Sequence, residues 1–160
     1  MKQAKDVMCD SPKHCEKNES LKNVVNEMSK SNIGSLPVVD KDKKVIGVVT
    51  DRDICIGLAK TDKPLSELKV GDVMSSQAHT CKLEDSADTA LRLMRLKQVG
   101  RLPVVDKEGR LQGILSLNGI VRHHRKNNEK VEEQYPGKEN VINTLHSIAE
   151  RNHKHDYQLA

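Results

Sequence analysis

The chain has 160 residues, of which 36% are hydrophobic, and it contains no Phe, no Trp and only two Tyr. A chain of this length fits one domain or two very small ones, and its core must be built from aliphatic side chains. The formal net charge of +4 suits an anionic partner, but the lack of aromatic side chains removes the base-stacking platforms that single-strand and RNA-binding proteins use.

The first predicted elements are a short apolar segment around Val7, a second one at Cys15 and then a helix. Ser20 is a good N-cap, and apolar residues follow it at the i, i+3, i+4 and i+7 spacing of one helix face. Gly34 is expected to end this helix, because glycine readily adopts the left-handed conformation at C′. The apolar face consists of Leu21, Val24, Val25 and Met28.

Two β-branched runs at 36–40 and 45–50 follow this helix and predict a hairpin. The connection between them, 41–44, is short and charged, as a surface turn should be. A second helix is predicted at 51–59, so this part of the chain has a β-α-β-β-α order. A connector at 61–70 comes next.

The same pattern then begins again. Shifting the chain by 66 residues aligns 36–41 with 102–107, both of which read Leu-Pro-Val-Val-Asp-Lys, and no gap is needed elsewhere. Ser86 takes the place of Ser20 as the N-cap, and Gly100 takes the place of Gly34. The sequence therefore predicts an α+β protein with repeat 1 at 5–60 and repeat 2 at 71–126. Each repeat is expected to have a three-stranded sheet with two helices on one face, which leaves apolar surface for the other repeat to cover.

The tail at 127–160 is predicted to contain a polar linker, 127–137, and an amphipathic helix from 138 or 139 to 152. Two roles stay open for this helix: it folds back on its own repeats, or it forms a dimer contact. Its apolar face is predicted to consist of Val141, Ile142, Leu145, Ile148 and Ala149.

The chain has no apolar run of the ~20 residues that a membrane span needs, and its start has no apolar stretch for a signal peptide. We therefore expect a cytoplasmic protein with neither a membrane nor a nucleic-acid partner. The four cysteines, Cys9, Cys15, Cys55 and Cys81, form no C-x-x-C pair and are expected to be free thiols. Whether Cys15 and Cys81 line a cleft or fill the core is open.

The Gly-x-Leu-Pro-Val-Val-Asp strand, the Gly-Val-Val-Thr-Asp-Arg-Asp segment at 47–53 and the twofold recurrence of the pattern resemble the CBS domain. The chain is similar to a tandem CBS pair, or Bateman module, over about 5–126. This resemblance implies two repeats packed with pseudo-twofold symmetry. It also implies a non-enzymatic sensor with clefts for AMP, ADP, ATP or S-adenosylmethionine, and association into a homodimer.

The family's ribose-binding pattern is a hydroxyl residue, two spacers and an acid, and Thr50-Asp51-Arg52-Asp53 satisfies it. The resemblance implies that Asp53 accepts hydrogen bonds from the ribose hydroxyls, with Thr50 beside it near a helix N-terminus. The alternative is that Thr50 or Asp51 only caps the helix and Asp53 is a stabilising first-turn acid.

The resemblance places Asp53 opposite the loop of the other repeat that contains Val99, Gly100 and Arg101. Arg101 would then contact phosphate, because its planar guanidinium matches phosphate oxygens, and Thr80 would lie near the base. The alternative for Arg101 is a solvated surface residue.

The second cleft of the resemblance departs from the family pattern. Ser116 is present, but Gly119 occupies the acid position, and Ser35, beside Gly34, stands where repeat 2 has Arg101. We expect this cleft to be weak or empty, so one ligand should bind per chain.

No catalytic motif occurs in the sequence, and the seven histidines show no recognised zinc-ligand spacing. We expect no catalytic residues, no metal site and no cofactor other than the regulatory ligand. The main hypothesis is a sensor that passes its ligand state to an unknown protein effector. The alternative is a structural or oligomerisation protein with vestigial clefts that acts through its C-terminal helix.

Overall fold

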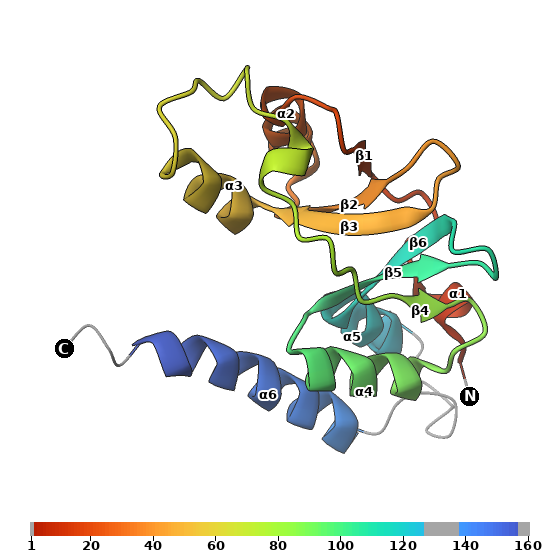
Figure 1. Cartoon of the computed structure of the whole chain (residues 1–160). Coiled ribbons are helices and arrows are strands. Elements are labelled where there is room, and N and C mark those ends of the chain that lie inside the picture. Colours follow the sequence, from red (N-terminus) through yellow and green to blue (C-terminus); the bar gives the residue numbers. More distant parts are fainter. Residues whose placement is uncertain (1, 127–137, 157–160) are drawn as a thin grey trace. The chain divides into compact units, whose positions relative to one another are not determined.

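The computed structural model describes residues 2–126 and 138–156, and within them it forms two three-stranded sheets and six α-helices (Figure 1). The predicted α+β class is therefore confirmed, and the C-terminal helix is present. The linker predicted at 127–137 lies outside the described residues, as do the side chains of His153 and His155.

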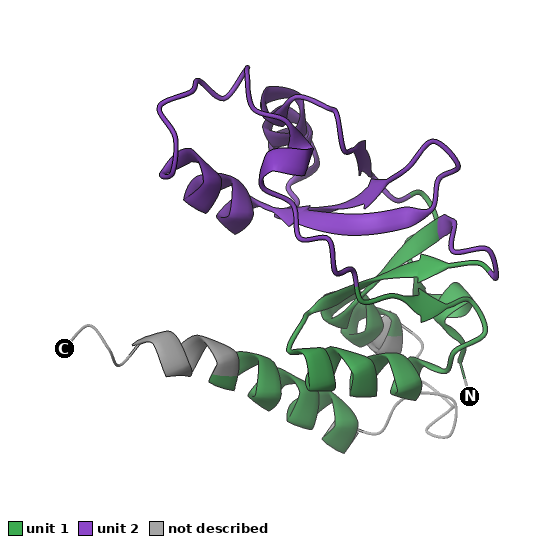
Figure 2. Ribbon diagram, viewed as in Figure 1, with its two compact units in different colours: residues 1–11, 79–106, 112–160 green, residues 12–78, 107–111 purple. Residues whose placement is uncertain are grey.

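The chain divides into two compact units (Figure 2). Unit 2 comprises residues 12–78 and 107–111 and contains most of repeat 1. In its sheet, strand β1 runs parallel to β2, and β2 runs antiparallel to β3, with Ser35 opposite Thr50. The elements of unit 2 are β1 (Cys15–Glu16), α2 (Leu21–Ser31), β2 (Ser35–Val39), β3 (Val45–Thr50), α3 (Asp51–Leu58) and the 3₁₀ turn η1 (Val70–Asp72).

Unit 1 comprises residues 1–11, 79–106 and 112–160. Its sheet has the order β4-β5-β6, with β4 parallel to β5, so it repeats the topology of the sheet in unit 2. The elements of unit 1 are α1 (Ala4–Val7), β4 (Cys81–Lys82), α4 (Ala87–Lys97), β5 (Arg101–Val105), β6 (Leu111–Ser116), α5 (Leu117–Lys126) and α6 (Lys138–Asp156).

Each unit has its own aliphatic core between its sheet and its helices. Leu36 and Val49 are fully buried in unit 2, and Leu102 and Leu115, which are 66 residues further along, are fully buried in unit 1. The predicted N-caps are also confirmed, because the Ser20 hydroxyl accepts a hydrogen bond from Lys22 N and the Ser86 hydroxyl accepts one from Thr89 N. The repeated pattern thus produces two closely similar bodies.

The compact units do not coincide with the sequence repeats, because the first segment of each repeat packs on the body of the other repeat. Cys9 and Ile114 exchange two backbone hydrogen bonds of 2.9 and 3.0 Å in unit 1. Ser75 and Val48 exchange the corresponding pair in unit 2, at 2.9 and 3.0 Å. A Cβ atom at Gly113 would lie 2.8 Å from the Cys9 carbonyl oxygen, so the glycine permits this close approach of two backbones.

The prediction that Gly34 and Gly100 end the first helix of each repeat is wrong. Asn32 is the C-cap of α2 and Gln98 is the C-cap of α4, and both residues adopt the left-handed conformation, with φ of 50° and 52°. Asn tolerates this region, and in both helices the cap N–H donates to carbonyl groups of the last turn. A Cβ atom at Gly34 would lie 2.8 Å from Asp51 Oδ2, which is the movable end of an exposed side chain, so crowding does not require glycine there.

Helix α6 folds back on repeat 2 and lies alongside α4 in unit 1 (Figure 1). The hydroxyl of Thr144, which is 1% exposed, donates to the carbonyl of Leu91 at 3.4 Å, and the hydroxyl of Ser147 donates to the carbonyl of Arg95 at 3.1 Å. The predicted apolar face is therefore divided: Val141 and Ile148 pack on the core, whereas Ile142 and Leu145 remain exposed.

None of the helices that the structure describes is both long enough and apolar enough to cross a membrane.

Candidate functional site

Thr50 and Asp53 lie at the junction of β3 and α3, where they form a capping box. The Asp53 N–H donates to Thr50 Oγ1 at 3.1 Å, which satisfies one of the free N–H groups at the start of the helix. In return, Asp53 Oδ2 accepts from Thr50 N at 3.0 Å and from Thr50 Oγ1 at 2.7 Å. Thr50 therefore caps α3, and Asp53 is an acid of its first turn, as the capping alternative proposed.

The capping box leaves part of Asp53 available for a ligand. Both residues are half-buried, and Asp53 Oδ1 receives no hydrogen bond from the part of the chain that the structure describes. The contacts on Oδ2 hold the carboxylate in one orientation, so its other oxygen is a preorganised acceptor. Such an acceptor suits a hydroxyl donor. Because Asp51 and Asp53 both occupy the first turn of α3, an anionic group would be repelled here.

Gly34 and Ser35 lie next to this junction in the same unit. Ser35 is the register partner of Thr50 in the β2–β3 ladder, and the Asp51 N–H donates to the Gly34 carbonyl at 3.1 Å. The structure thus brings Gly34 and Ser35 together with Thr50 and Asp53, although the family resemblance implied that the two pairs belong to different clefts. Their use by one ligand or by two stays a prediction.

Unit 1 has the corresponding arrangement without the acid. The Leu117 N–H donates to the Gly100 carbonyl at 3.0 Å, and the Ser116 hydroxyl accepts from the Gly119 N–H at 2.9 Å. Ser116 therefore makes the capping contact that Thr50 makes, but no carboxylate orients it, because residue 119 is glycine.

Arg101 is the first residue of β5, and its side chain is exposed. It forms no ion pair within the described residues, so its guanidinium is available to an anion. Val99 is half-buried against the core of unit 1, and Thr80 is half-buried directly before β4. A side chain at position 100 would have room, since a Cβ atom there would meet nothing within 4 Å. Because Asp53 and Arg101 belong to different units, their pairing stays a prediction.

The question about Cys15 and Cys81 is answered by their burial, since each is 2% exposed and belongs to the core of its unit. Burial, followed by the nearby Glu19 carboxylate, raises the pKa of the Cys15 thiol to about 12. Burial, followed by Asp85, raises the pKa of the Cys81 thiol to about 12 as well. Both side chains are structural and are poorly suited to chemistry at neutral pH.

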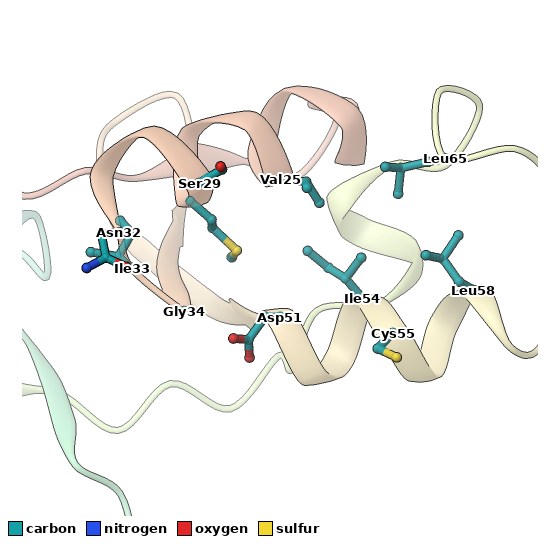
Figure 3. A pocket seen from close by; sticks show the side chains of 11 residues that line it. Val25, Ser29, Asn32, Ile33, Gly34, Asp51, Ile54, Cys55, Leu58 and Leu65 are labelled. Carbon is teal, nitrogen blue, oxygen red and sulfur yellow. The ribbon is translucent and has the colours of Figure 1, made fainter.

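Helices α2 and α3 of unit 2 border a groove with a volume of about 620 Å³, which we call the α2–α3 groove (Figure 3). It was not predicted from the sequence. Its walls are mostly apolar, with the Asp51 carboxylate and the Asn32 side chain at one end. Spacing at i, i+4 on each helix was the signal available, but it also fits an ordinary core face. The walls include Val25, Ser29 and Ile33 on one side and Ile54, Cys55 and Leu58 on the other.

Among the side chains that the structure describes, which lie within residues 2–123 and 139–150, no group of three or more His, Cys, Asp or Glu residues is placed to hold a metal ion.

Comparison with known proteins shows the family. The model of the CBS domain matches residues 4–60 and again residues 70–126. The inosine-5′-monophosphate dehydrogenase of Methanocaldococcus jannaschii is 36% identical over 121 residues, which are 76% of this chain but only 22% of the dehydrogenase. The uncharacterized protein YlbB of Bacillus subtilis is 32% identical over 121 residues, and the match covers 75% of this chain and 80% of YlbB.

Among solved structures, the chain is similar to the CBS domain pair of protein MJ0100, which was crystallised in complex with 5′-methylthioadenosine and S-adenosyl-L-methionine. The TM-score is 0.69 and the identity 26%, over 79% of this chain and 98% of the other. The repeated topology of the two units agrees with this likeness. The chain belongs to the CBS domain family and contains two CBS domains in tandem.

Proposed function

We propose that the chain is a regulatory module that binds an adenosine-containing ligand through Thr50 and Asp53 and passes its state to a protein effector. The ligand class is AMP, ADP, ATP, S-adenosylmethionine or 5′-methylthioadenosine. Non-enzymatic regulation is the general role of CBS pairs, and the match to the dehydrogenase spans only 22% of that enzyme. We also propose that the module acts as a homodimer.

The geometry of Asp53 carries this proposal. A carboxylate with one oxygen held by Thr50 and the other open offers a fixed acceptor to a ribose hydroxyl. The likeness to the MJ0100 pair, which binds two adenosine compounds, supports the same ligand class for this chain. We further propose that Val99, Gly100, Arg101 and Thr80 complete the site, with Arg101 as the contact for a phosphate when the ligand carries one.

The acidic start of α3 bears on where each part of the ligand lies. Asp51 and Asp53 together place two carboxylates in one helical turn, so this end of the site favours hydroxyl donors or a cationic group over phosphate. We propose that the ribose, and not the phosphate, lies against Thr50 and Asp53. Arg101 is then the group whose removal should separate phosphorylated from unphosphorylated ligands.

The test is a thermal-shift titration with each of the five ligands on the native chain and on Asp53→Asn. A ligand that binds only the folded state at a hundredfold excess over Kd stabilises it by about 2.7 kcal/mol. Asp53→Asn keeps an acceptor for the capping box but removes the charge, so the affinity should fall about tenfold, since hydrogen bonds to charged groups are the stronger ones.

The matched control is Asp51→Asn, which removes the same charge from the same helical turn but leaves Asp53 and Thr50 in place. This variant should retain most of the ligand-induced rise in Tm. If both variants lose that rise equally, the ligand responds to the total charge of the helix end and not to a specific contact with Asp53. If none of the five ligands raises the Tm of the native chain, the sensor proposal is wrong and the structural alternative gains support.

A further inference from the structure

The two repeats differ in what covers their first helix. In unit 1, α6 lies on the side of α4 that carries Leu91, Arg95 and Gln98: the carbonyls of Leu91 and Arg95 accept hydrogen bonds from α6, and the Gln98 side chain donates to the Ser147 carbonyl at 3.4 Å. The corresponding positions on α2, 66 residues earlier, are Val25, Ser29 and Asn32. All three line the α2–α3 groove (Figure 3).

The α2–α3 groove is therefore the counterpart in repeat 1 of the surface that a helix covers in repeat 2. No helix within residues 2–126 and 138–156 covers it. Its mostly apolar walls and its volume of about 620 Å³ make it a suitable seat for large aliphatic side chains. The internal repeat indicates the kind of occupant, which is a helix that presents such side chains.

The chain itself supplies a helix with a second apolar surface. Ile142 is 62% exposed and Leu145 is 48% exposed. Together with the exposed Ala149 they recur at i, i+3 and i+7, on the side of α6 away from Thr144 and Ser147. We call this surface the α6 ridge. It remains open while α6 stays docked on its own α4, so a partner can engage it without undocking the helix.

A difference in charge indicates which face of α6 the groove accepts. In unit 1 the side-chain amide of Asn140 donates to Asp88 at 2.9 Å. The residue that corresponds to Asp88 in repeat 1 is Lys22, which has no acceptor to offer. The groove therefore cannot repeat the contact of the docked face. Lys22 instead favours an acidic neighbour, and the exposed Glu139 lies three residues before Ile142, on the flank of the α6 ridge.

We propose that the α6 ridge of a second copy of this chain docks in the α2–α3 groove, and that the reciprocal contact closes a homodimer. Each α6 then lies between its own α4 and the first repeat of its partner. The inference rests on the homodimer of the proposed function and names the surfaces that form it. It does not depend on the ligand.

Cysteine cross-linking tests this contact, because Cys55 lines the groove and is exposed. Leu145→Cys is introduced with Cys9→Ser, since Cys9 is the other exposed thiol among the described residues. A disulfide requires Cα atoms about 4.4–6.8 Å apart. Mild oxidation should therefore join residue 145 of one copy to residue 55 of another, identified by the linked peptide in a mass spectrum.

Two matched controls separate this contact from random collision. Leu96→Cys in the same background places a thiol at a leucine that is 69% exposed and lies outside both surfaces, and it should cross-link at least tenfold more slowly. Adding Cys55→Ser to Leu145→Cys should abolish the cross-link. Equal rates for the two cysteine positions, or a cross-link that persists without Cys55, would overturn the inference.

Light scattering on the native chain and on Ser29→Glu separates this inference from the homodimer itself. Ser29 is exposed and lines the groove, so the variant should fold and should raise the dimer dissociation constant at least tenfold, whereas Leu96→Glu should leave it unchanged. A native dimer that Ser29→Glu does not weaken would overturn the docking and leave the homodimer standing. A native chain that is monomeric throughout would overturn both, and the ligand titration would still test the sensor.

Discussion

Repeat 1 and repeat 2 have the same pattern of elements and a serine N-cap on the first helix, yet they differ at the positions where function is expected. Asp53 in repeat 1 corresponds to Gly119 in repeat 2. Only Asp53 offers a carboxylate acceptor beside the hydroxyl residue that caps the helix. The first helix of repeat 2 is covered by α6, whereas that of repeat 1 borders an open groove. The duplicated pattern thus maintains two similar cores, while the surfaces of the two repeats differ.

The equivalence of the two cores can be tested at one pair of leucines. Leu36 and Leu102 occupy corresponding places and are both fully buried. Either substitution by Ala should cost about 2–5 kcal/mol of unfolding free energy, through lost burial and the cavity left behind. Urea unfolding followed by circular dichroism measures both losses. If one substitution lowers the unfolding free energy several times more than the other, the two cores are not equivalent.

The buried thiols should make both repeats sensitive to high pH. The pKa of each thiol rises from 9.0 to about 12 on folding, so the unfolded chain loses these protons before the folded one. Their contribution is full below pH 9 and falls as the pH rises towards 12, by up to about 1.4 kcal/mol per pH unit for each thiol. Between pH 8 and 10, the free energy of unfolding should therefore fall less steeply with pH in Cys15→Ala and in Cys81→Ala than in the native chain. Equal slopes in the native chain and both variants would contradict this assignment.

A smaller effect is expected at the contact that only repeat 2 has. Thr144 is 1% exposed, and its hydroxyl donates to the carbonyls of Leu91 and Asn140. Thr144→Val keeps the shape and removes the donor, so the unfolding free energy should fall by about 1 kcal/mol. The exposed Asn143, changed to Ala, is the control and should change little. No loss in Thr144→Val would mean that the Thr144 hydroxyl does not stabilise the docking of α6 on α4.

Much of the fold could be predicted because local signals repeat. The apolar stripe after Ser20 and the identical strand segments at 36–41 and 102–107 predicted the first helix and the hairpin of each repeat. The helix ends were predicted wrongly because Asn32 and Gln98 take the left-handed conformation that glycine usually takes. The exchange of first segments could not be predicted, since it depends on long-range backbone pairing such as that of Cys9 with Ile114.

The candidate site was predictable in part. The spacing of Thr50 and Asp53 predicted a hydroxyl and an acid at a helix start, and their capping box shows this local geometry. The proximity of Ser35 to Thr50 was missed, because it follows from the register of β2 and β3. The division of the α6 apolar face was also missed, because hydrophobicity does not reveal that Thr144 and Ser147 point their hydroxyls at the carbonyls of α4.

The most direct measurement is the binding stoichiometry of the adenosine ligand, determined by isothermal titration calorimetry on the native chain. The difference between Asp53 and Gly119 predicts one ligand per chain, and Asp53→Asn should weaken that single event. Two equivalent ligands per chain would contradict the account, because repeat 2 would then bind without the acid. No binding of any of the five ligands would contradict the proposed sensor function itself.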